Sequence, residues 1–298
     1  MSKNIEKLIM TKHDQYQNPI IDAYLADPYI FVADDFYYLV ASGKAMDTRY
    51  LPIYRSSDLV KWEFIRGAVS FGKEGAWNRK NFWAPEVTQI DGKFYLYYTA
   101  SDGIAPKNTG NRVGLAVSDA PDGPYEDLGV VVSNASLDGS PFRDIDGTLY
   151  LYYTVEYGNS DGLVAGQIYV DQLITPQEVA GKPKLIMGDY PWQEGPCVLY
   201  SNESYYLTFS LGSWGKGDYE VHWSVSDSSF GPFLKEPNPL LSSTDSVKGP
   251  GHHNFFVDKS GKNWIVYHGW DNDFTARYPR IDPLIIGDKN ISTIGPTS

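Results

Sequence analysis

The sequence is poor in cysteine, because Cys197 is the only one among its 298 residues. A single thiol excludes an intrachain disulfide, and nothing in the chain requires an oxidising compartment. Since Cys197 lies in an apolar stretch, we interpret it as a small buried hydrophobic residue and not as a nucleophile.

Long apolar runs are also absent. No stretch approaches the roughly 20 apolar residues that a helix needs to cross a bilayer. The N-terminal segment MSKNIEKLIM contains scattered charges and lacks the apolar core of a secretion signal. We therefore expect a soluble, cytoplasmic protein with no membrane partner.

Positive charge is scarce as well. The chain has 25 Lys and Arg against 37 Asp and Glu, which gives a formal net charge of −12. Such a surface repels phosphate backbones and anionic lipids, so nucleic acid is excluded as a partner, whereas a neutral sugar meets no such repulsion. The oligomeric state carries no signal in the sequence.

Aromatic residues and turn formers are abundant. Phe, Trp and Tyr make up 15% of the chain, and there are 28 Gly and 19 Pro. Aromatic residues favour pleated, half-buried surfaces, and Gly and Pro favour turns. No long segment shows a helical apolar period, so the composition predicts many short strands and few helices.

Five segments repeat one plan, in which a polar residue is followed by a hydrophobic strand, a tight turn and an aromatic strand. Their polar residues are 59, 52, 56 and 58 residues apart and are Asp27, Glu86, Asp138, Glu194 and His252. The turns include Asp91-Gly92, Asp146-Gly147 and Ser260-Gly261. Asp-Gly between alternating runs is a strong hairpin signal, because Gly supplies the positive φ that such turns need.

Four strands per unit, repeated radially, are typical of a propeller. We predict one all-β domain over residues 1–298, a five-bladed β-propeller with four antiparallel strands per blade around a central channel. A β-sandwich would explain the strands but not their regular recurrence. Because the innermost strands line the channel, the repeated carboxyl groups should converge there. Crowded carboxylates raise one another's pKa, and two carboxyl groups with separated pKa values are what glycoside hydrolysis uses.

The sequence resembles glycoside hydrolase family 43 over nearly its whole length. The motifs that carry the resemblance are Ala26-Asp27-Pro28, Trp83-Ala84-Pro85-Glu86, Leu137-Asp138 with Phe142 and Asp146-Gly147, Glu194-Gly195-Pro196, and Gly249-Pro250-Gly251-His252. The resemblance implies that Asp27 is the general base, that Glu194 is the general acid, and that Asp138 orients the acid and modulates its pKa. It also implies inversion at the anomeric carbon, for which carboxyl groups lie roughly 6.5–9.5 Å apart.

The same resemblance suggests substrate contacts. Glu86 stands where family members often carry Asp, and Trp83 and Trp192 are either sugar platforms or blade packing. Arg277 is our choice for the arginine near the reacting sugar, with Arg280 as the alternative and a surface salt bridge as the ordinary explanation for both.

A histidine at the place of His252 commonly helps such enzymes to hold a hydrated ion, usually calcium, in the channel. Calcium prefers oxygen ligands, so a lone imidazole needs water to complete the shell. We therefore predict His252 as the metal residue of a structural calcium site, with no cofactor required for the chemistry. His253 should face away from the axis, since neighbours on a strand point to opposite sides. His268 is interpreted as a core histidine.

Family members act on α-L-arabinofuranosides, β-D-xylosides and arabinan. The chain ends soon after its last repeat, without the additional β-sandwich that many of the family's β-xylosidases carry, which favours an arabinose-directed enzyme. A cytoplasmic enzyme would trim imported oligosaccharides, so we expect an exo-acting α-L-arabinofuranosidase on arabino- or arabinoxylo-oligosaccharides. The alternatives are a β-D-xylosidase, an endo-α-1,5-arabinanase and a non-catalytic carbohydrate-binding propeller. A protein-interaction propeller is disfavoured, because its usual Trp-Asp signature is absent.

Overall fold

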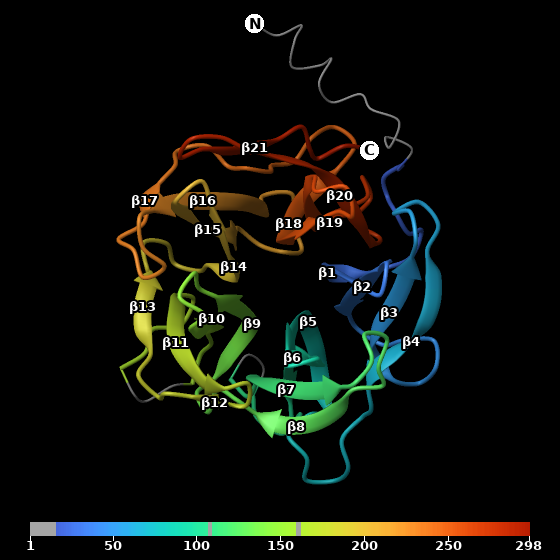
Figure 1. The fold of residues 1–298 in the computed structure, drawn as a ribbon. Coiled ribbons are helices and arrows are strands. Elements are labelled where there is room, and N and C mark those ends of the chain that lie inside the picture. Colours follow the sequence, from blue (N-terminus) through green and yellow to red (C-terminus); the bar gives the residue numbers. More distant parts are fainter. Residues whose placement is uncertain (1–15, 107–108, 159–161) are drawn as a thin grey trace, which may run out of the picture.

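The computed structural model describes residues 16–106, 109–158 and 162–298, and these residues form strands joined by loops (Figure 1). No helix occurs in the part of the chain that the structure describes, so none there is long and apolar enough to cross a bilayer. The strands form five sheets arranged radially around one axis, which confirms the predicted five-bladed propeller.

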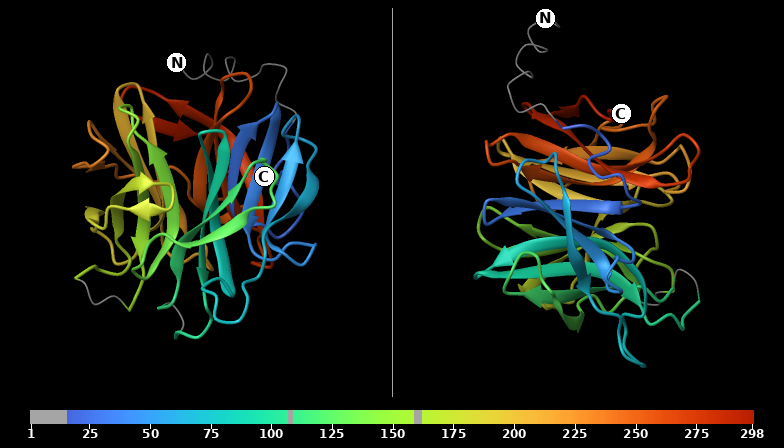
Figure 2. Two further views of the ribbon diagram at one scale, coloured as in Figure 1. Left: turned by 60° about the horizontal axis from the view of Figure 1, so that its bottom comes forward. Right: turned by 90° about the vertical axis from the view of Figure 1, so that its right-hand side faces the viewer.

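The blades follow one another along the chain, and within each blade the strands pair antiparallel in sequence order, as the side views also show (Figure 2). Blade 1 contains β1 (Ala26–Ala33), β2 (Phe36–Ser42), β3 (Tyr50–Ser56) and β4 (Glu63–Val69). Blade 2 contains β5 (Lys80–Ile90), β6 (Lys93–Ser101), β7 (Arg112–Ser118) and β8 (Glu126–Val130). Blade 3 contains β9 (Ser136–Arg143), β10 (Leu149–Val155), β11 (Ile168–Thr175) and β12 (Glu178–Val179), and β13 (Lys184–Met187) also pairs with β11. Blade 4 contains β14 (Glu194–Ser201), β15 (Ser204–Leu211), β16 (Glu220–Ser226) and β17 (Leu234–Lys235). Blade 5 contains β18 (Lys248–Val257), β19 (Asn263–Trp270), β20 (Arg277–Ile286) and β21 (Ile291–Thr293).

The hydrophobic core is divided among the blades. One buried cluster lies between each pair of neighbouring blades, and the last cluster packs blade 5 against blade 1 through residues such as Leu39 and Trp264. Buried tyrosines such as Tyr97 and Tyr153 fill much of this space. The high tyrosine content is therefore explained by packing between sheets, where a large ring covers much apolar area.

The segment before β1 ties the first blade to the last. The Ile20 amide donates to the carbonyl of Pro279 at 3.0 Å, and the Asn18 side chain donates to the carbonyl of Ile281 at 2.8 Å. The N-terminal segment thus runs along β20 and helps to close the ring.

Each innermost strand contains a bulge near its start, and one residue of each bulge has a positive φ. These residues are Asp27 (50°), Ala84 (47°), Asp138 (59°), Gly195 (57°) and His252 (45°). Their spacings of 57, 54, 57 and 57 residues are more even than the spacings predicted from the sequence. The predicted alignment was therefore wrong for two carboxylates, because Glu86 lies two residues after the equivalent position and Glu194 lies one residue before it.

Candidate active site

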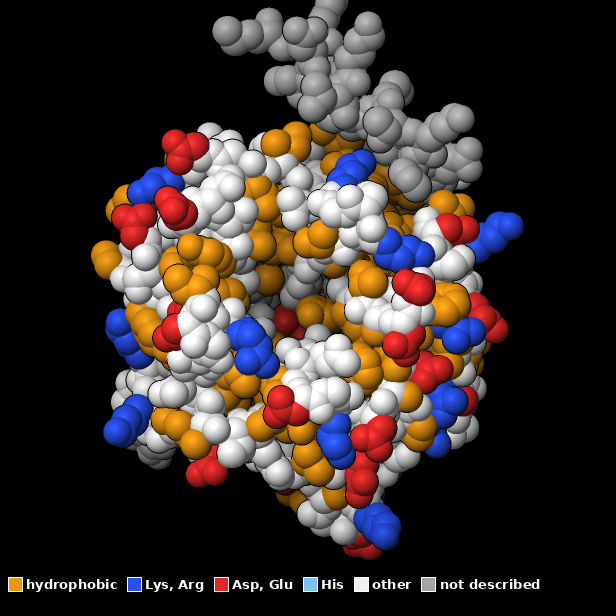
Figure 3. Space-filling view, in the orientation of Figure 1, with side chains coloured by type: hydrophobic (Ala, Val, Ile, Leu, Met, Phe, Trp, Pro, Cys, Tyr) orange, Lys and Arg blue, Asp and Glu red, His pale blue; other side chains and the backbone are white. Residues whose placement is uncertain are grey.

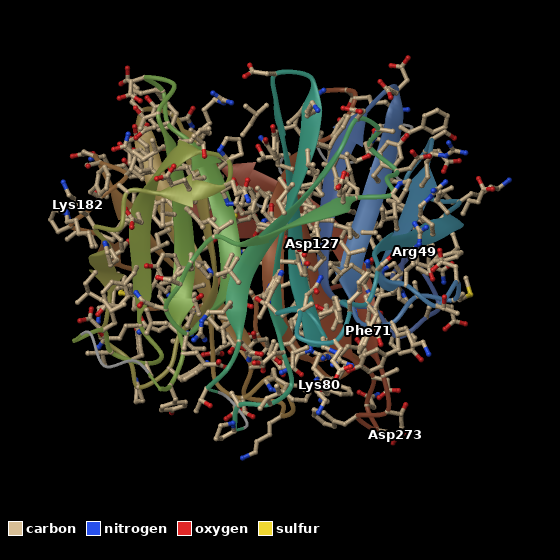
Figure 4. All side chains as sticks on the ribbon, turned by 90° about the horizontal axis from the view of Figure 1, so that it is seen from below. Arg49, Phe71, Lys80, Asp127, Lys182 and Asp273 are labelled. Carbon is tan, nitrogen blue, oxygen red and sulfur yellow. The ribbon has the colours of Figure 1, made fainter. Side chains whose placement is uncertain are left out.

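The five bulges lie toward the end of the propeller at which the innermost strands begin. Figure 4 labels Lys80, the first residue of β5, and shows Phe71 and Asp273 at the same end of the molecule. Figure 3 looks along the axis from the opposite end, where the centre of the ring is hollow and an acidic side chain is visible deep inside it. Bulges re-aim side chains that a regular strand would point elsewhere, so these positions can bring different blades to one site.

A repeated hydrogen bond fixes the bulges. In three blades the amide of the positive-φ residue donates to a hydroxyl on the second strand of the preceding blade. The pairs are Ala84 with Ser42 (2.7 Å), Asp138 with Thr99 (3.0 Å) and His252 with Ser210 (2.9 Å). In blade 1 the Asp27 amide instead donates to Nδ1 of His268, across the closure of the ring, at 3.1 Å.

Blade 4 differs from this pattern, because the acceptor of its bulge amide is a carboxyl group. The Gly195 amide donates to Oδ2 of Asp138 at 2.9 Å instead of to a hydroxyl. The Thr154 hydroxyl, which stands where the acceptor would be, donates to the carbonyl of Gln193 at 3.1 Å. The carboxyl of Asp138 is therefore bonded to the residue that follows Glu194.

Asp27 is a largely buried carboxylate, with a side chain 12% exposed, and donors and cations surround it. Ser42 donates its hydroxyl to Oδ2, and Oδ1 lies 3.5 Å from Nη1 of Arg277 and 3.7 Å from Nδ1 of His252. Burial by itself would raise the pKa of Asp27, but the nearby cations outweigh it and hold this pKa below its usual range. Asp27 is therefore ionised at neutral pH.

His252 stands between two of the carboxyl groups. Its Nδ1 lies 3.7 Å from Oδ1 of Asp27 and 3.8 Å from Oδ2 of Asp138. Burial lowers the pKa of His252, but the surrounding carboxylates outweigh that effect and raise it. Burial also raises the pKa of Asp138, and the negative charges of Glu194 and Asp27 add to that increase.

Glu194 receives a hydrogen bond on each carboxyl oxygen. Trp192 donates its indole Nε1 to Oε2 at 2.7 Å, and Tyr219 donates its hydroxyl to Oε1 at 2.7 Å. Trp192 was predicted as a sugar contact, but its edge faces Glu194 and one face of its ring stacks on Tyr157 at 5.3 Å. Tyr219 was not found from the sequence, because it lies just before β16 and outside the repeated motifs.

The structure separates the two candidate arginines. Arg277 lies 3.5 Å from Asp27 and packs its guanidinium over Trp214, 4.7 Å from the ring centroid. Tyr24 accepts two further hydrogen bonds from this guanidinium, at 3.1 and 3.0 Å. Arg280 is buried and donates to the carbonyl of Thr297 at 2.8 Å. Arg277 is thus the arginine of the site.

Exposed aromatic rings surround these groups. Trp83 is 36% exposed, and Tyr24 and Trp214 are 50% and 52% exposed beside Arg277. Exposed aromatic faces next to buried carboxylates are typical of sites that stack on sugar rings, because such rings offer apolar area at low entropic cost.

Glu86 belongs to a second layer of the channel, two residues beyond its bulge. Its oxygens accept hydrogen bonds from Ser140 and Asn254, each at 3.0 Å. Burial raises the pKa of Glu86 to about 8, against the hydrogen bonds that lower it. The carboxyl of Glu86 is therefore protonated at neutral pH and links blades 2, 3 and 5.

Among the described residues, the structure does not add a cluster of protein ligands to His252. Within the described ranges no group of three or more His, Cys, Asp or Glu side chains is arranged to hold a metal ion. The calcium ion at His252 stays a prediction, and no step of the mechanism proposed below uses it.

The remaining interpretations concern buried residues. His268 is fully buried, and burial lowers its pKa to about 4, so it is a neutral core histidine as expected. His253 points away from the carboxyl groups and contacts Thr208 at 2.6 Å. Cys197 is buried, and burial raises its pKa well above the ordinary value, so it is no nucleophile.

A five-bladed propeller with clustered carboxyl groups and exposed aromatic rings at one mouth defines a carbohydrate-active protein. The family model for glycosyl hydrolases family 43 matches residues 16–290, and the chain belongs to this family. The chain is therefore a glycoside hydrolase with a carbohydrate substrate.

Individual relatives agree with this assignment. The chain is 28% identical over 297 residues to a β-D-galactofuranosidase of Aspergillus niger, covering 91% of this chain and 81% of the relative. It is 27% identical over 289 residues to the extracellular exo-α-(1→5)-L-arabinofuranosidase ArbA of Cellvibrio japonicus, covering 82% and 78%. The crystal structure of a thermostable family-43 glycoside hydrolase is 30% identical, with a TM-score of 0.82 and coverage of 95% and 97%.

The relatives contradict the predicted cytoplasmic location. ArbA and three further relatives, from Bacillus subtilis, Thermotoga petrophila and Streptomyces avermitilis, are all named as extracellular enzymes. The chain spans 66% and 64% of the two among these that are named endo-α-(1→5)-L-arabinanases. The prediction failed because it rested on the absence of a secretion signal, and that absence does not report location.

Proposed function

We propose that this chain is an inverting, exo-acting α-L-arabinofuranosidase that releases L-arabinose from arabino- or arabinoxylo-oligosaccharides. The observation that carries the chemistry is the contrast between Asp27 and Asp138, the carboxyl group that is bonded to the backbone beside Glu194. The charges of His252 and Arg277 hold the pKa of Asp27 below its usual range, while burial raises the pKa of Asp138. A carboxylate that stays ionised is suited to the role of general base, and Glu194, the neighbour of Gly195, is the carboxyl group that we assign as the general acid.

In this mechanism Asp27 accepts a proton from a water molecule as the water oxygen attacks the anomeric carbon. Glu194 donates its proton to the departing glycosidic oxygen as that bond breaks. Asp138, which accepts the Gly195 amide, holds the backbone beside Glu194 in place. His252 balances the negative charge between the acidic groups. Because water attacks from the face opposite to the leaving group, the product has inverted configuration.

The preference for a furanoside is supported by the names of two relatives. One is a β-D-galactofuranosidase and the other an exo-α-(1→5)-L-arabinofuranosidase. α-L-Arabinofuranose and β-D-galactofuranose share a five-membered ring with the same arrangement of hydroxyl groups. The extracellular relatives support a substrate that is met outside the cell.

A β-D-xylosidase is the second candidate. A relative from Bacillus subtilis is named β-xylosidase, at 28% identity and 84% coverage of this chain. A solved endo-1,4-β-xylanase from Bacteroides thetaiotaomicron is 28% identical, with a TM-score of 0.78. Both candidate activities require the same carboxyl groups. They differ only in the sugar that is released, arabinose or xylose.

The test is hydrolysis of arabino-oligosaccharides and xylo-oligosaccharides by wild type, Asp27→Ala and Glu194→Ala, with the product anomer followed by proton NMR. We expect arabinose of inverted configuration from wild type, and loss of most activity in both variants, by about a hundredfold or more. Release of xylose alone would favour the second candidate. Sugar binding without turnover would make the protein a carbohydrate-binding propeller.

A further inference from the structure

Trp192 and Tyr219 approach the same carboxyl group from two sides. Trp192 donates to Oε2 of Glu194 and Tyr219 donates to Oε1, each at 2.7 Å. An indole nitrogen can only donate, so Oε2 is fixed as an acceptor. Burial and the charge of Glu194 raise the pKa of Tyr219 well above the ordinary value, so its hydroxyl keeps its proton.

Each ring lies against a glycine, in space that a side chain would otherwise fill. A Cβ at Gly251 would lie 2.1 Å from Cε1 of Tyr219, and a Cβ at Gly166 would lie 2.9 Å from Cε3 of Trp192. Only a residue without a side chain leaves room for each ring at that distance. The packing of Tyr219 against Gly251 and of Trp192 against Gly166 therefore sets where the two hydrogen-bond donors lie.

Both rings also stack on another ring. Tyr219 lies parallel to the buried imidazole of His268, with centroids 5.8 Å apart and planes at 8°. Trp192 stacks on Tyr157 with centroids 5.3 Å apart and planes at 27°. A donor locked by packing loses little entropy when it orients a reacting group, which is the basis of preorganisation.

We propose that Trp192 and Tyr219 are positioning residues that hold the carboxyl of Glu194 in the orientation from which it protonates the leaving oxygen. The pair, which we name the acid clamp, rests on the proposed role of Glu194 as general acid. Because each donor holds one oxygen, the two hydrogen bonds fix the plane of the carboxyl group. Neither ring transfers the proton itself.

The experiment measures kcat/KM for phenyl, 4-nitrophenyl and 2,4-dinitrophenyl glycosides of the sugar that wild type accepts. A 2,4-dinitrophenolate is a good leaving group without protonation, whereas a phenolate must be protonated by the general acid as it leaves. We expect Trp192→Phe and Tyr219→Phe to lose about tenfold to a hundredfold on the phenyl glycoside and less than about threefold on the dinitrophenyl glycoside. Glu194→Gln should show the same dependence on the leaving group with a larger loss.

Two further variants separate orientation from folding. Gly251→Ala displaces the Tyr219 ring without touching its hydroxyl, and we expect it to reproduce the pattern of Tyr219→Phe. Tyr152→Phe removes a buried hydroxyl that donates to the carbonyl of Ser229 at 2.6 Å, and it should leave the ratio between leaving groups at the wild-type value. Equal losses on all three glycosides in both clamp variants would overturn the acid clamp while leaving an active wild type and its proposed function standing. A wild type that hydrolyses no glycoside would overturn both.

Discussion

The backbone amide of Asp27 donates to Nδ1 of His268 at 3.1 Å, so the residue proposed as the general base in blade 1 is held by a side chain of blade 5. Three other blades use Ser or Thr for this bond. Burial lowers the pKa of His268 to about 4, so the ring is neutral and Nδ1 is available to accept this bond.

We expect His268→Phe to lower the free energy of unfolding by about 1–3 kcal/mol, because it leaves the buried Asp27 amide without an acceptor. His268→Asn is the matched control, since an amide oxygen can occupy the place of Nδ1, and it should cost less than His268→Phe. Urea denaturation followed by tryptophan fluorescence measures both. Equal destabilisation by the two variants would show that the hydrogen bond is not what matters.

Glu86 provides a pH-dependent stability that can be isolated by substitution. Its pKa is raised from 4.5 to about 8 in the folded chain, so the folded state binds more protons than the unfolded state between these values. The stability of wild type relative to Glu86→Gln should therefore fall as the pH rises from about 4.5 to about 8, by up to about 5 kcal/mol, and then level off.

Thermal or urea unfolding of wild type and Glu86→Gln across this pH range makes the measurement. Gln keeps partners for Ser140 and Asn254 but has no proton to lose, so the difference between the two curves reports Glu86 alone. Parallel curves from pH 4 to 9 would contradict the raised pKa.

Arg277 should not tolerate replacement by Lys. Its guanidinium contacts Asp27, stacks over Trp214 and donates twice to Tyr24, and an ammonium group cannot match that planar geometry. We expect Arg277→Lys to reduce kcat/KM by about tenfold to a hundredfold. The matched control is Arg55→Lys, because Arg55 pairs with Glu63 on the surface and such pairs contribute little.

Asp138→Asn tests the contribution of a charge at constant shape. The amide oxygen can still accept the Gly195 amide, but the negative charge next to His252 is removed. We expect kcat to fall by about tenfold to a thousandfold with a small change in KM. Asp144→Asn is a suitable control, since Asp144 accepts from Tyr205 and Ser229 between blades 3 and 4 and has no contact with the site. A loss confined to KM would assign Asp138 to substrate binding.

The blades could be predicted because strand, turn and aromatic spacing repeat visibly in the sequence. The alignment within the blades could not, because what repeats is a backbone conformation. Ala84 and Gly195 occupy positions equivalent to Asp27 and Asp138, but neither carries a functional group that marks the place. Carboxyl groups were therefore matched to one another although they sit at different offsets from their bulges.

Only the site residues that lie within the repeated motifs could be predicted from the sequence. Arg277 and Arg280 lie three residues apart on β20 and so point to opposite faces, but periodicity does not reveal which face is turned to the site. Tyr219 reaches Glu194 from a loop without any repeated pattern, and its orientation depends on the missing side chain of Gly251. Contacts of this kind are set by packing between distant segments.

The bond between Asp27 and His268 also orders events during synthesis. Its partners are 241 residues apart, so the amide of Asp27 has no acceptor from blade 5 until nearly the whole chain has left the ribosome. Contacts between such distant positions form late, because a long loop must close first. An incomplete chain that ends before blade 5 would contain Asp27, Asp138 and Glu194, but the amide of Asp27 would lack its acceptor. Folding of the last blade would therefore complete the surroundings of the proposed base.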